Sequence, residues 1–389
     1  SFGNFCCNGL VNAVREPHPH LKEVKKAYQY IKCTLKDPKN LTIAIKNWYD
    51  FTNLNAYVLK WSIVGDNGKM LAKGEQSIEV APHATTEVSL GGVRLPRNIR
   101  EAYLNLSWTP KKKSAFIGTD DEVAYDQFVL PANSQYRPTL AKLSEKPEIQ
   151  IDPKTGALTS YIYEGQEYLA SPVRLSLYRP ATDNDNREKK GGAKVWRKLG
   201  LNHLVQRVLS VKTSGHTTYS EVKLLNDKND TIGSATFEYT IRKDGILSVQ
   251  TRFVPDTTFV SSLARVGLVF EMPHSFNRVT YLGRGEHETY ADRKLSGRIG
   301  IYHTDAERMF HYYVRPQATG NRTDVRWMQV SDELEKGLSV WGEKPFEFSV
   351  SPFTDENIDA AGHINELKRN GTVTVHLDAL QSGVGTATC

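Results

Sequence analysis

The stretch ATFEYTIRKDGILSVQTRF, which runs from Ala235 to Phe253, decides the fold class. Its apolar residues alternate with polar residues on both sides of the turn sequence Lys243-Asp-Gly245. Alternation with a period of two is typical of half-buried strands, and a glycine turn between two such runs indicates a hairpin. This stretch therefore predicts an antiparallel pair with one buried face and one solvated face.

The same period dominates the rest of the chain after residue 137. We expect further strands at 263–271, 310–314, 324–330, 337–342, 346–351 and 372–378. One helix is predicted from Asp355 to Arg369, because Ile358, Ala361, Ile364 and Leu367 lie on one face at helical spacing. This amount of strand exceeds one small sandwich, and it predicts a large antiparallel sandwich.

A second strand-rich region precedes this one. Its expected strands are at 41–45, 57–63, 76–80, 86–90, 102–108 and 123–130. The tripeptide Asp66-Asn-Gly68 predicts a hairpin after the second of them. Roughly seven short strands within this length indicate an immunoglobulin-like sandwich. The composition of Pro131–Pro138 is that of a linker, and we place a domain boundary there.

The N-terminal residues differ from both regions. A helix is predicted from His18 to Ile31, with Pro19 in the first turn, where its missing N–H costs nothing. Before it lies a loop with Cys6, Cys7 and Asn8, and no strand or helix comes before that loop. Polar and reactive loops usually sit on a scaffold that positions them, so we expect the chain to be the C-terminal part of a longer protein.

Composition places the 389-residue chain among soluble globular proteins, with 39% hydrophobic and 24% charged residues. No apolar run approaches the ~20 residues that span a bilayer, so we expect no membrane partner. The net charge of +6 is spread along the chain, and nothing in its pattern indicates a nucleic acid partner. Four cysteines in this length form no disulfide framework, and the cellular compartment stays undecided.

Three polar segments are candidate sites. Residues Asp183–Asn186 could ligate calcium, supply an acid/base pair of aspartates, or form a loop held by Asx turns, and we favour the last. Residues 281–293 carry Glu286, His287 and Glu288, which suit either a sugar site or an ion-pair network. Residues 313–327 suit either carbohydrate binding or a loop that braces two sheets. No nucleotide-binding, zinc-protease or serine-hydrolase motif is present.

Taken in order, these segments resemble the C-terminal portion of the bacterial β-galactosidases of glycoside hydrolase family 2. The matching pieces are Phe5-Cys-Cys-Asn-Gly-Leu-Val11, Arg15-Glu-Pro-His-Pro19, Tyr49-Asp-Phe-Thr-Asn53, Tyr178-Arg-Pro-Ala-Thr-Asp-Asn-Asp185, Tyr281-Leu-Gly-Arg-Gly285 with Glu288 and Asp292-Arg293, Pro316-Gln317, Gly320-Asn-Arg-Thr-Asp-Val-Arg-Trp327, Phe348-Ser-Val-Ser-Pro352 and Gly383-Val-Gly385. They span nearly the whole chain in the order of the family.

The resemblance implies three domains in an otherwise all-β fold. Residues 1–33 would be a remnant loop and helix from the C-terminal end of the catalytic (β/α)8, or TIM, barrel. Residues 34–130 would be the immunoglobulin-like β-sandwich, and residues 137–389 the small-chain domain, a galactose-mutarotase-like β-supersandwich.

The resemblance also implies the activity of the complete enzyme, a retaining β-galactosidase that hydrolyses terminal non-reducing β-D-galactose residues. Both catalytic glutamates belong to the missing N-terminal region, so no catalytic residue is expected in this chain, which would be inactive alone. The expected partners are β-galactosides, that missing region and, in the complete enzyme, further copies in a homo-oligomer. Its location would be the bacterial cytoplasm or periplasm.

By position in the family motifs, Phe5 through its carbonyl and Asn8 through its side chain would hold part of an alkali-cation site, with Na⁺ or K⁺ as the ion. Mg²⁺ would be bound elsewhere in the complete enzyme. Asn8, His287 and Asn321 are the candidate substrate-binding residues. The sequence departs from the family where Glu286 and Ala291 replace prolines and Thr289 replaces an asparagine.

Three other functions remain open at this point. The large sandwich could be a carbohydrate-binding module, with residues such as Asp183, His287 and Trp327 on a concave face. It could instead be a scaffold for subunit assembly. A mutarotase activity would need a histidine and a glutamate placed as an acid/base pair, which the sequence does not show.

Overall fold

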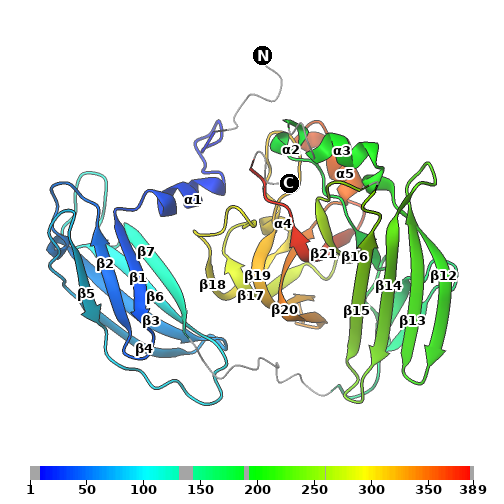
Figure 1. The fold of residues 1–389 in the computed structure, drawn as a ribbon, viewed down its shortest axis with the longest axis horizontal. Helices are drawn as coiled ribbons and strands as arrows, with labels where there is room; N and C mark the ends of the chain where they lie inside the picture. The colour runs from blue at the N-terminus through cyan, green and yellow to red at the C-terminus, as the bar shows by residue number, and fades with distance from the viewer. Residues whose placement is uncertain (1–8, 131–142, 188–191, 259, 386–389) are drawn as a thin grey trace. The chain divides into compact units, whose positions relative to one another are not determined.

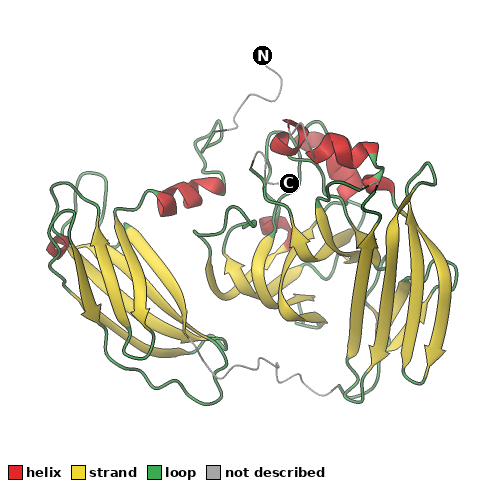
Figure 2. Cartoon of the chain, viewed as in Figure 1, coloured by secondary structure: helices red, strands yellow, loops and turns green. Residues whose placement is uncertain are grey.

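The computed structural model describes residues 9–130, 143–187, 192–258 and 260–385. These residues form two compact units, which we describe separately. The smaller unit contains Pro17–Pro138 and Leu295–Ile301, and the larger unit contains the rest of the chain. Strands dominate both units, as Figure 2 shows, and the predicted all-β class is confirmed. In the described part of the chain, no helix is both long enough and apolar enough to cross a membrane.

The smaller unit is a sandwich of a three-stranded and a four-stranded sheet, with strand orders β1-β2-β5 and β4-β3-β6-β7 (Figure 1). Its elements are α1 (His20–Ala27), β1 (Ile31–Asp37), β2 (Thr42–Asn47), η1 (Leu54–Ala56), β3 (Tyr57–Gly65), β4 (Met70–Gln76), β5 (Thr85–Ser89), β6 (Ala102–Pro110) and β7 (Ala124–Leu130). Fully buried side chains from both sheets, among them Ile31, Leu59 and Trp108, form its core. The predicted hairpin is confirmed, with Gly68 at φ 75° between β3 and β4.

The larger unit is built on a seven-stranded sheet with the order β11-β16-β21-β20-β19-β17-β18 and a four-stranded sheet β12-β13-β14-β15. A third sheet, β10-β9-β8, completes it. Its strands are β8 (Glu148–Ile151), β9 (Leu158–Tyr163), β10 (Gln166–Glu167), β11 (Arg174–Ser176), β12 (Val205–Ser214), β13 (Thr217–Leu225), β14 (Thr231–Ile241), β15 (Leu247–Pro255), β16 (Arg265–Pro273), β17 (Arg278–Gly285), β18 (Arg298–Asp305), β19 (Arg322–Ser331), β20 (Gly337–Ser351) and β21 (Thr372–Gln381).

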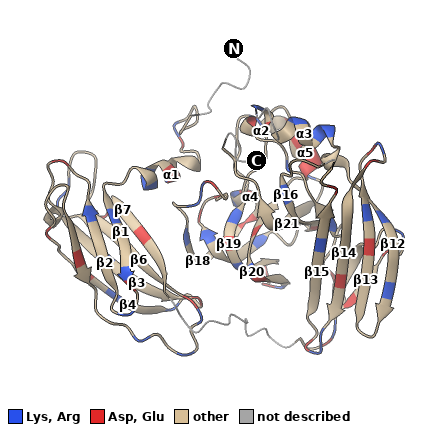
Figure 3. Cartoon of the chain, in the orientation of Figure 1, with Lys and Arg blue, Asp and Glu red and all other residues tan. Residues whose placement is uncertain are grey.

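The two main sheets of the larger unit share one core. Phe237 and Tyr239 of β14 belong to the same buried cluster as Phe270 of β16 and Phe348 of β20. The stretch that predicted the fold is the β14–β15 hairpin, in which Ile241 pairs with Leu247 and Gly245 takes φ 85°. Acidic and basic residues are interspersed on β12–β15, as Figure 3 shows, which is consistent with a solvated outer face.

Short helices connect the strands of the larger unit. They are α2 (Asp183–Arg187), α3 (Gly192–Lys198), η2 (Leu201–His203), α4 (Ala306–Met309), α5 (Asp355–Ala360) and η3 (Ile364–Glu366). The predicted helix from Asp355 to Arg369 is therefore too long. It ends where Ala361 adopts an extended conformation, just before Gly362.

Three further predictions of secondary structure are wrong in detail. The helix predicted from His18 to Ile31 is only α1, because Ile31 enters β1 and is fully buried in the smaller sandwich. No strand forms at 310–314, where Phe310 packs against Phe353 and Ile358 instead of joining a sheet. Residues 77–80 follow the end of β4 without pairing as a strand. The boundary proposed within 131–138 lies outside the described residues.

Candidate functional site

Four loops of the larger unit meet in one place, which we call the loop cluster. It consists of residues 179–185, 287–293, 313–323 and 382–385, and so it unites the three polar segments that the sequence singled out with the glycine-rich turn after β21. Backbone hydrogen bonds join the loops, from Ala318 N–H to the carbonyl of Pro180 (3.0 Å) and from Thr289 N–H to the carbonyl of Asn321 (2.8 Å).

Asp292 holds the glycine-rich turn. Its carboxylate accepts hydrogen bonds from the backbone N–H groups of Val384 (3.0 Å) and Gly385 (2.7 Å). The side chain of Asn184 donates to the carbonyl of Val384 at 2.8 Å. A Cβ atom on Gly383 would lie only 2.5 Å from Cγ of Asp292, so this close approach requires glycine.

Arg179 binds the backbone carbonyls of the same turn. Its guanidinium forms a two-pronged ion pair with Asp185, at 3.1 Å from Nε and 2.8 Å from Nη2, and both side chains are buried. The remaining N–H groups donate to the carbonyls of Ser382 (2.6 Å) and Gly383 (2.7 Å). This fork geometry is specific to arginine, and it ties two segments about 200 residues apart in sequence.

The segment Asp183–Asn186 belongs to a short helix, α2, and not to the Asx-turn loop that we favoured. Thr182 caps it, because the N–H of Asp185 donates to Oγ1 of Thr182 (3.1 Å) while the N–H of Thr182 donates to Oδ2 of Asp185 (2.9 Å). Both carboxylate oxygens of Asp185 are thus engaged in structure. Within the described ranges, no three His, Cys, Asp or Glu side chains come together as a metal site.

Glu288 is the buried anion at the centre of the loop cluster. Its carboxylate accepts hydrogen bonds from Tyr313 Oη (2.9 Å), from the N–H of Gly320 (2.8 Å) and from the side chains of Thr319 and Arg293. Burial alone would raise the pKa of Glu288, but the charge of Arg293 and these hydrogen bonds lower it to about 2. Glu288 therefore stays ionised and braces two loops.

The structure places two of the predicted substrate-binding residues, His287 and Asn321, in the loop cluster but buries them to different degrees. His287 is partly exposed next to Glu288, whereas Asn321 is 1% exposed. The amide of Asn321 donates to the carbonyl of Thr289 (3.0 Å) and to Glu347 (2.6 Å), so it points toward the sheet. Phe5 and Asn8 lie outside the described residues, and the roles proposed for all four stay predictions.

Sequence reasoning missed a row of polar side chains on the seven-stranded sheet. On β20 and β21 the apolar residues face the core, while the opposite face carries polar residues that are also buried. These are Glu347, Ser349, Ser351, Thr374, His376 and Asp378. The alternation of apolar and polar residues along these strands indicates a polar face, and such a face is usually exposed to solvent. Parts of the loop cluster and α5 engage this row instead: Asn321 bonds Glu347, and Asp355 accepts from His376 Nε2 at 3.2 Å.

Glu347 and Asp378 are direct cross-strand partners on this row. Burial and, to a lesser extent, the charge of Asp378 raise the pKa of Glu347 to about 7, although the hydrogen bond from Asn321 acts in the opposite direction. The pKa of Asp378 is also raised, chiefly by burial. Two carboxylates this close resist ionising together, so Glu347 carries a proton through much of the acidic and neutral range.

This arrangement predicts that Glu347→Gln stabilises the protein above neutral pH. A folded-state pKa above the unfolded value means that stability is lost as pH rises from about 4.5 to 7. Glutamine can still accept from Asn321 but cannot ionise, so we expect a gain of about 2 kcal/mol at pH 8 that shrinks toward zero at pH 4.5. Urea unfolding across this range measures it, with the exposed Glu221→Gln as control. An equal gain at pH 4.5 and pH 8 would contradict the assignment.

The loops of the cluster are therefore held in place by buried carboxylates. The carboxylates of Asp185, Glu288 and Asp292 each bind donors from the cluster itself, and these bonds fix the backbone of all four loops.

Comparison with known proteins agrees with this division of the chain. A family model described as "Beta galactosidase small chain" matches residues 144–389, and a model described as "Beta-galactosidase, domain 4" matches residues 43–131. The first covers the larger unit from β8 onward, including the whole loop cluster, and the second covers the smaller sandwich from the second residue of β2 to the end of β7.

Individual relatives cover the chain along almost its full length. A "Beta-galactosidase" of Priestia megaterium is 32% identical over 98% of this chain and 38% of its own length. A "Beta-galactosidase" of Actinobacillus pleuropneumoniae is 26% identical over 100% of this chain and 39% of its own length. "Beta-galactosidase 2" of Enterobacter cloacae is 27% identical over 98% and 39%. The chain thus spans about two fifths of the length of these relatives, and it belongs to the β-galactosidase family, as a small-chain region preceded by the family's domain 4.

Proposed function

We propose that this chain is the C-terminal region of a retaining β-galactosidase, which hydrolyses terminal non-reducing β-D-galactose residues. The single observation that carries the proposal is the order of the two family matches along the chain, domain 4 at 43–131 and small chain at 144–389. The relatives that match this chain end to end carry the name β-galactosidase and are more than twice as long.

In this proposal the reaction uses two carboxylates, a nucleophile that forms a covalent galactosyl intermediate and an acid/base that serves both steps. Both would belong, in this proposal, to the part of the complete enzyme that this chain does not span. The structure supports that division, because the buried acids of the loop cluster are held by arginine and backbone donors. Glu288, with a pKa of about 2, is a poor proton donor at neutral pH.

The cation sites belong to the proposal as well. The carbonyl of Phe5 and the side-chain oxygen of Asn8 would supply two ligands for Na⁺ or K⁺, since hard cations prefer oxygen donors. The other ligands, and those for Mg²⁺, would come from the complete enzyme. We also expect the complete enzyme to assemble as a homo-oligomer, with the large sandwich contributing contacts between subunits.

Hydrolysis of a chromogenic β-galactoside tests the proposal. We expect no turnover above buffer by the 389-residue chain alone, and turnover when it is mixed with a separately made barrel fragment from the Priestia megaterium relative. The barrel fragment alone is the control. Turnover by the chain alone would place a catalytic carboxylate pair within these residues. If the two fragments associate in sedimentation but the mixture shows no turnover, the proposal that this chain contributes to catalysis is wrong.

A further inference from the structure

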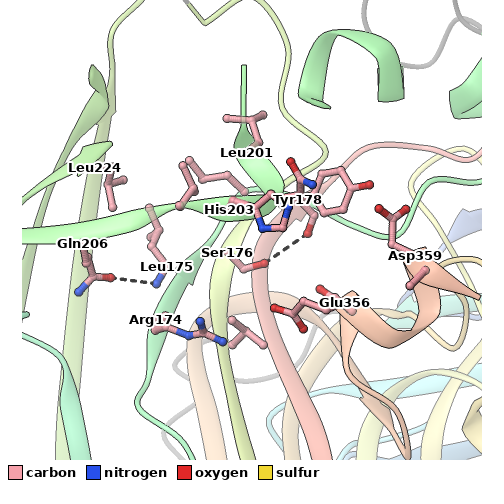
Figure 4. A pocket seen from close by; sticks show the side chains of 16 residues that line it. Arg174, Leu175, Ser176, Tyr178, Leu201, His203, Gln206, Leu224, Glu356 and Asp359 are labelled. Atoms are coloured by element: carbon pink, nitrogen blue, oxygen red, sulfur yellow. Dashed lines mark hydrogen bonds between the residues drawn. The ribbon is translucent and has the colours of Figure 1, made fainter. Parts of the chain in front are cut away.

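A pocket of about 280 Å³ opens in the larger unit, between the start of β12, the edge strand β11 and helix α5 (Figure 4). Its polar groups already interact within the chain. The hydroxyl of Tyr178 interacts with Asp359 and Arg197, which pair with each other at 2.9 Å. Gln206 accepts from the N–H of Leu175 at 3.4 Å. These groups shape the pocket wall and do not indicate a ligand.

The exposed aromatic residues at one end of the smaller sandwich are a different case. This surface, which we call the aromatic end, consists of Tyr28, Tyr30, Trp48 and Phe51. Their side chains are 77%, 51%, 53% and 96% exposed, respectively. Single exposed apolar residues are normal on a protein surface, but several large aromatic side chains gathered in one place usually mark an interaction surface.

Strand pairing gathers these side chains. β1 and β2 are antiparallel, and the first residue of β1 pairs with the last residue of β2. Tyr30 and Trp48 flank this pair and therefore lie side by side, where the N–H of Trp48 donates to the carbonyl of Tyr30 at 2.8 Å. Tyr28 and Phe51 lie in the connections directly next to them.

A stack of three tyrosine rings supports the aromatic end. The ring centroids of Tyr30 and Tyr49 are 4.9 Å apart, and those of Tyr49 and Tyr57 are 5.6 Å apart. Tyr49 and Tyr57 pack against the core of the smaller sandwich. The stack therefore leads from the core to the exposed ring of Tyr30. A surface that is supported in this way loses little conformational freedom when it binds a partner.

Folding of the chain gains almost nothing from Phe51. Because its side chain is 96% exposed, the hydrophobic free energy of this ring would be gained only on burial against a partner. The kind of partner follows from the ring faces. The ring of Tyr30 already stacks on Tyr49, and the ammonium of Lys32 lies 5.3 Å from the ring of Trp48. A sugar stacks on open ring faces, so this arrangement favours a protein surface.

Helix α1 indicates which protein surface this is. The chain enters the smaller unit through α1, which is fixed to the start of β7 (Figure 1). There Lys26 pairs with Asp126 at 2.7 Å, and Gln29 accepts from the N–H of Tyr125 at 3.1 Å. Tyr28 follows the last residue of α1, so this helix leads directly into the aromatic end.

We propose that the catalytic region of the complete enzyme packs on the aromatic end and buries Phe51 and Trp48. This inference rests on the proposed function, in which that region precedes α1 in a protein more than twice as long as this chain. A region joined to the smaller unit through α1 is present near the aromatic end at a high effective concentration.

Sedimentation of the 389-residue chain, mixed with the barrel fragment of the Priestia megaterium relative, tests the inference. We expect the unmodified chain to bind the fragment. Phe51→Asp should weaken this binding at least about tenfold, as expected for a central aromatic residue of an interface. The thermal midpoint of the chain alone should stay unchanged, because the replaced ring is exposed. Tyr28→Ser should weaken binding in the same direction.

Met70→Asp is the matched control. Met70 is 55% exposed at the start of β4, which lies at the opposite end of the same sandwich, so this variant should bind the fragment as the unmodified chain does. Absence of binding by the unmodified chain would overturn the inference, as would equal binding by Phe51→Asp. Self-association of the chain that Phe51→Asp abolishes would assign the surface to a second copy instead. Binding of millimolar D-galactose that Trp48→Ala abolishes would assign it to a sugar.

Turnover of a chromogenic β-galactoside by the same mixtures separates this inference from the proposed function. Binding that depends on Phe51 but gives no turnover would contradict the proposed activity and support the interface. Turnover that is equal for the unmodified chain and for Phe51→Asp at limiting concentrations of both fragments would support the activity and contradict the interface.

Discussion

Replacing Arg179 by alanine is expected to lower the free energy of unfolding by about 3–5 kcal/mol at pH 7, the cost of leaving a buried ion without its partner. Asp185 would remain buried and charged, and the carbonyls of Ser382 and Gly383 would lose their donors. Urea unfolding monitored by tryptophan fluorescence measures the loss, since Trp196 lies 5.6 Å from the guanidinium.

The control for this prediction is Arg242→Ala. Arg242 pairs with Asp244 at the surface, where both side chains are at least one-third exposed, so its loss should change stability by less than ~1 kcal/mol. A second variant isolates the charge. The double variant Arg179→Met, Asp185→Asn removes both charges but keeps an acceptor for the N–H of Thr182. It should be more stable than the single variant Arg179→Met. If Arg179→Ala cost under 1 kcal/mol, the buried pair would not hold the turn.

Glu288→Gln is expected to cost about 3 kcal/mol at pH 7, and the cost should vanish in acid. Lowering the pKa from 4.5 to about 2 means that the ionised form is favoured in the folded state. That stability is fully present above about pH 4.5, and it is lost as pH falls through the folded pKa. Glutamine keeps the shape of the side chain but leaves Arg293 without its counter-ion.

Unfolding curves collected from pH 7 down to pH 2.5 measure this effect. The stabilities of the variant and the unmodified chain should approach each other as the pH falls. Glu333→Gln serves as the control, because the side chain of Glu333 is 86% exposed and its ion pair with Arg278 is long, at 3.9 Å. A difference between the variant and the unmodified chain that stayed constant from pH 7 to pH 2.5 would mean that packing, and not charge, sets the role of Glu288.

Local pattern was sufficient for much of the fold. The two hairpins at Gly68 and Gly245 were predictable because each glycine turn lies between alternating runs, and both signals are confined to about twenty residues. The ends of helices were not. Ile31 and Ala361 leave their helices because of what the chain does next: Ile31 enters a sandwich core, and Ala361 precedes a glycine. Tertiary packing overrides helical spacing at Ile31, whereas the glycine after Ala361 is a local stop signal for the helix.

The residues of the loop cluster could be picked out from the sequence, but the contacts that they make could not. The three polar segments were visible in the sequence, yet nothing local shows that Arg179 reaches Ser382 across about 200 residues. The acidity of Glu288 depends on Arg293 and Thr319, which approach it from two loops. Glu347 was missed because its strand alternates normally, and only the segments that cover the sheet turn a polar residue into a buried one. Burial by distant segments has no signature in a single strand.

The buried polar face of β20 and β21 has a consequence for how such a protein can change over time. When loops cover an apolar sheet face, a change in those loops exposes the apolar side chains, and the variant then tends to aggregate. Here the residues beneath the loops are Glu347, Ser349, His376 and their neighbours, which water can solvate. Insertions and replacements in the covering loops would therefore leave a soluble intermediate, and new loop sequences could be sampled without first redesigning the sheet.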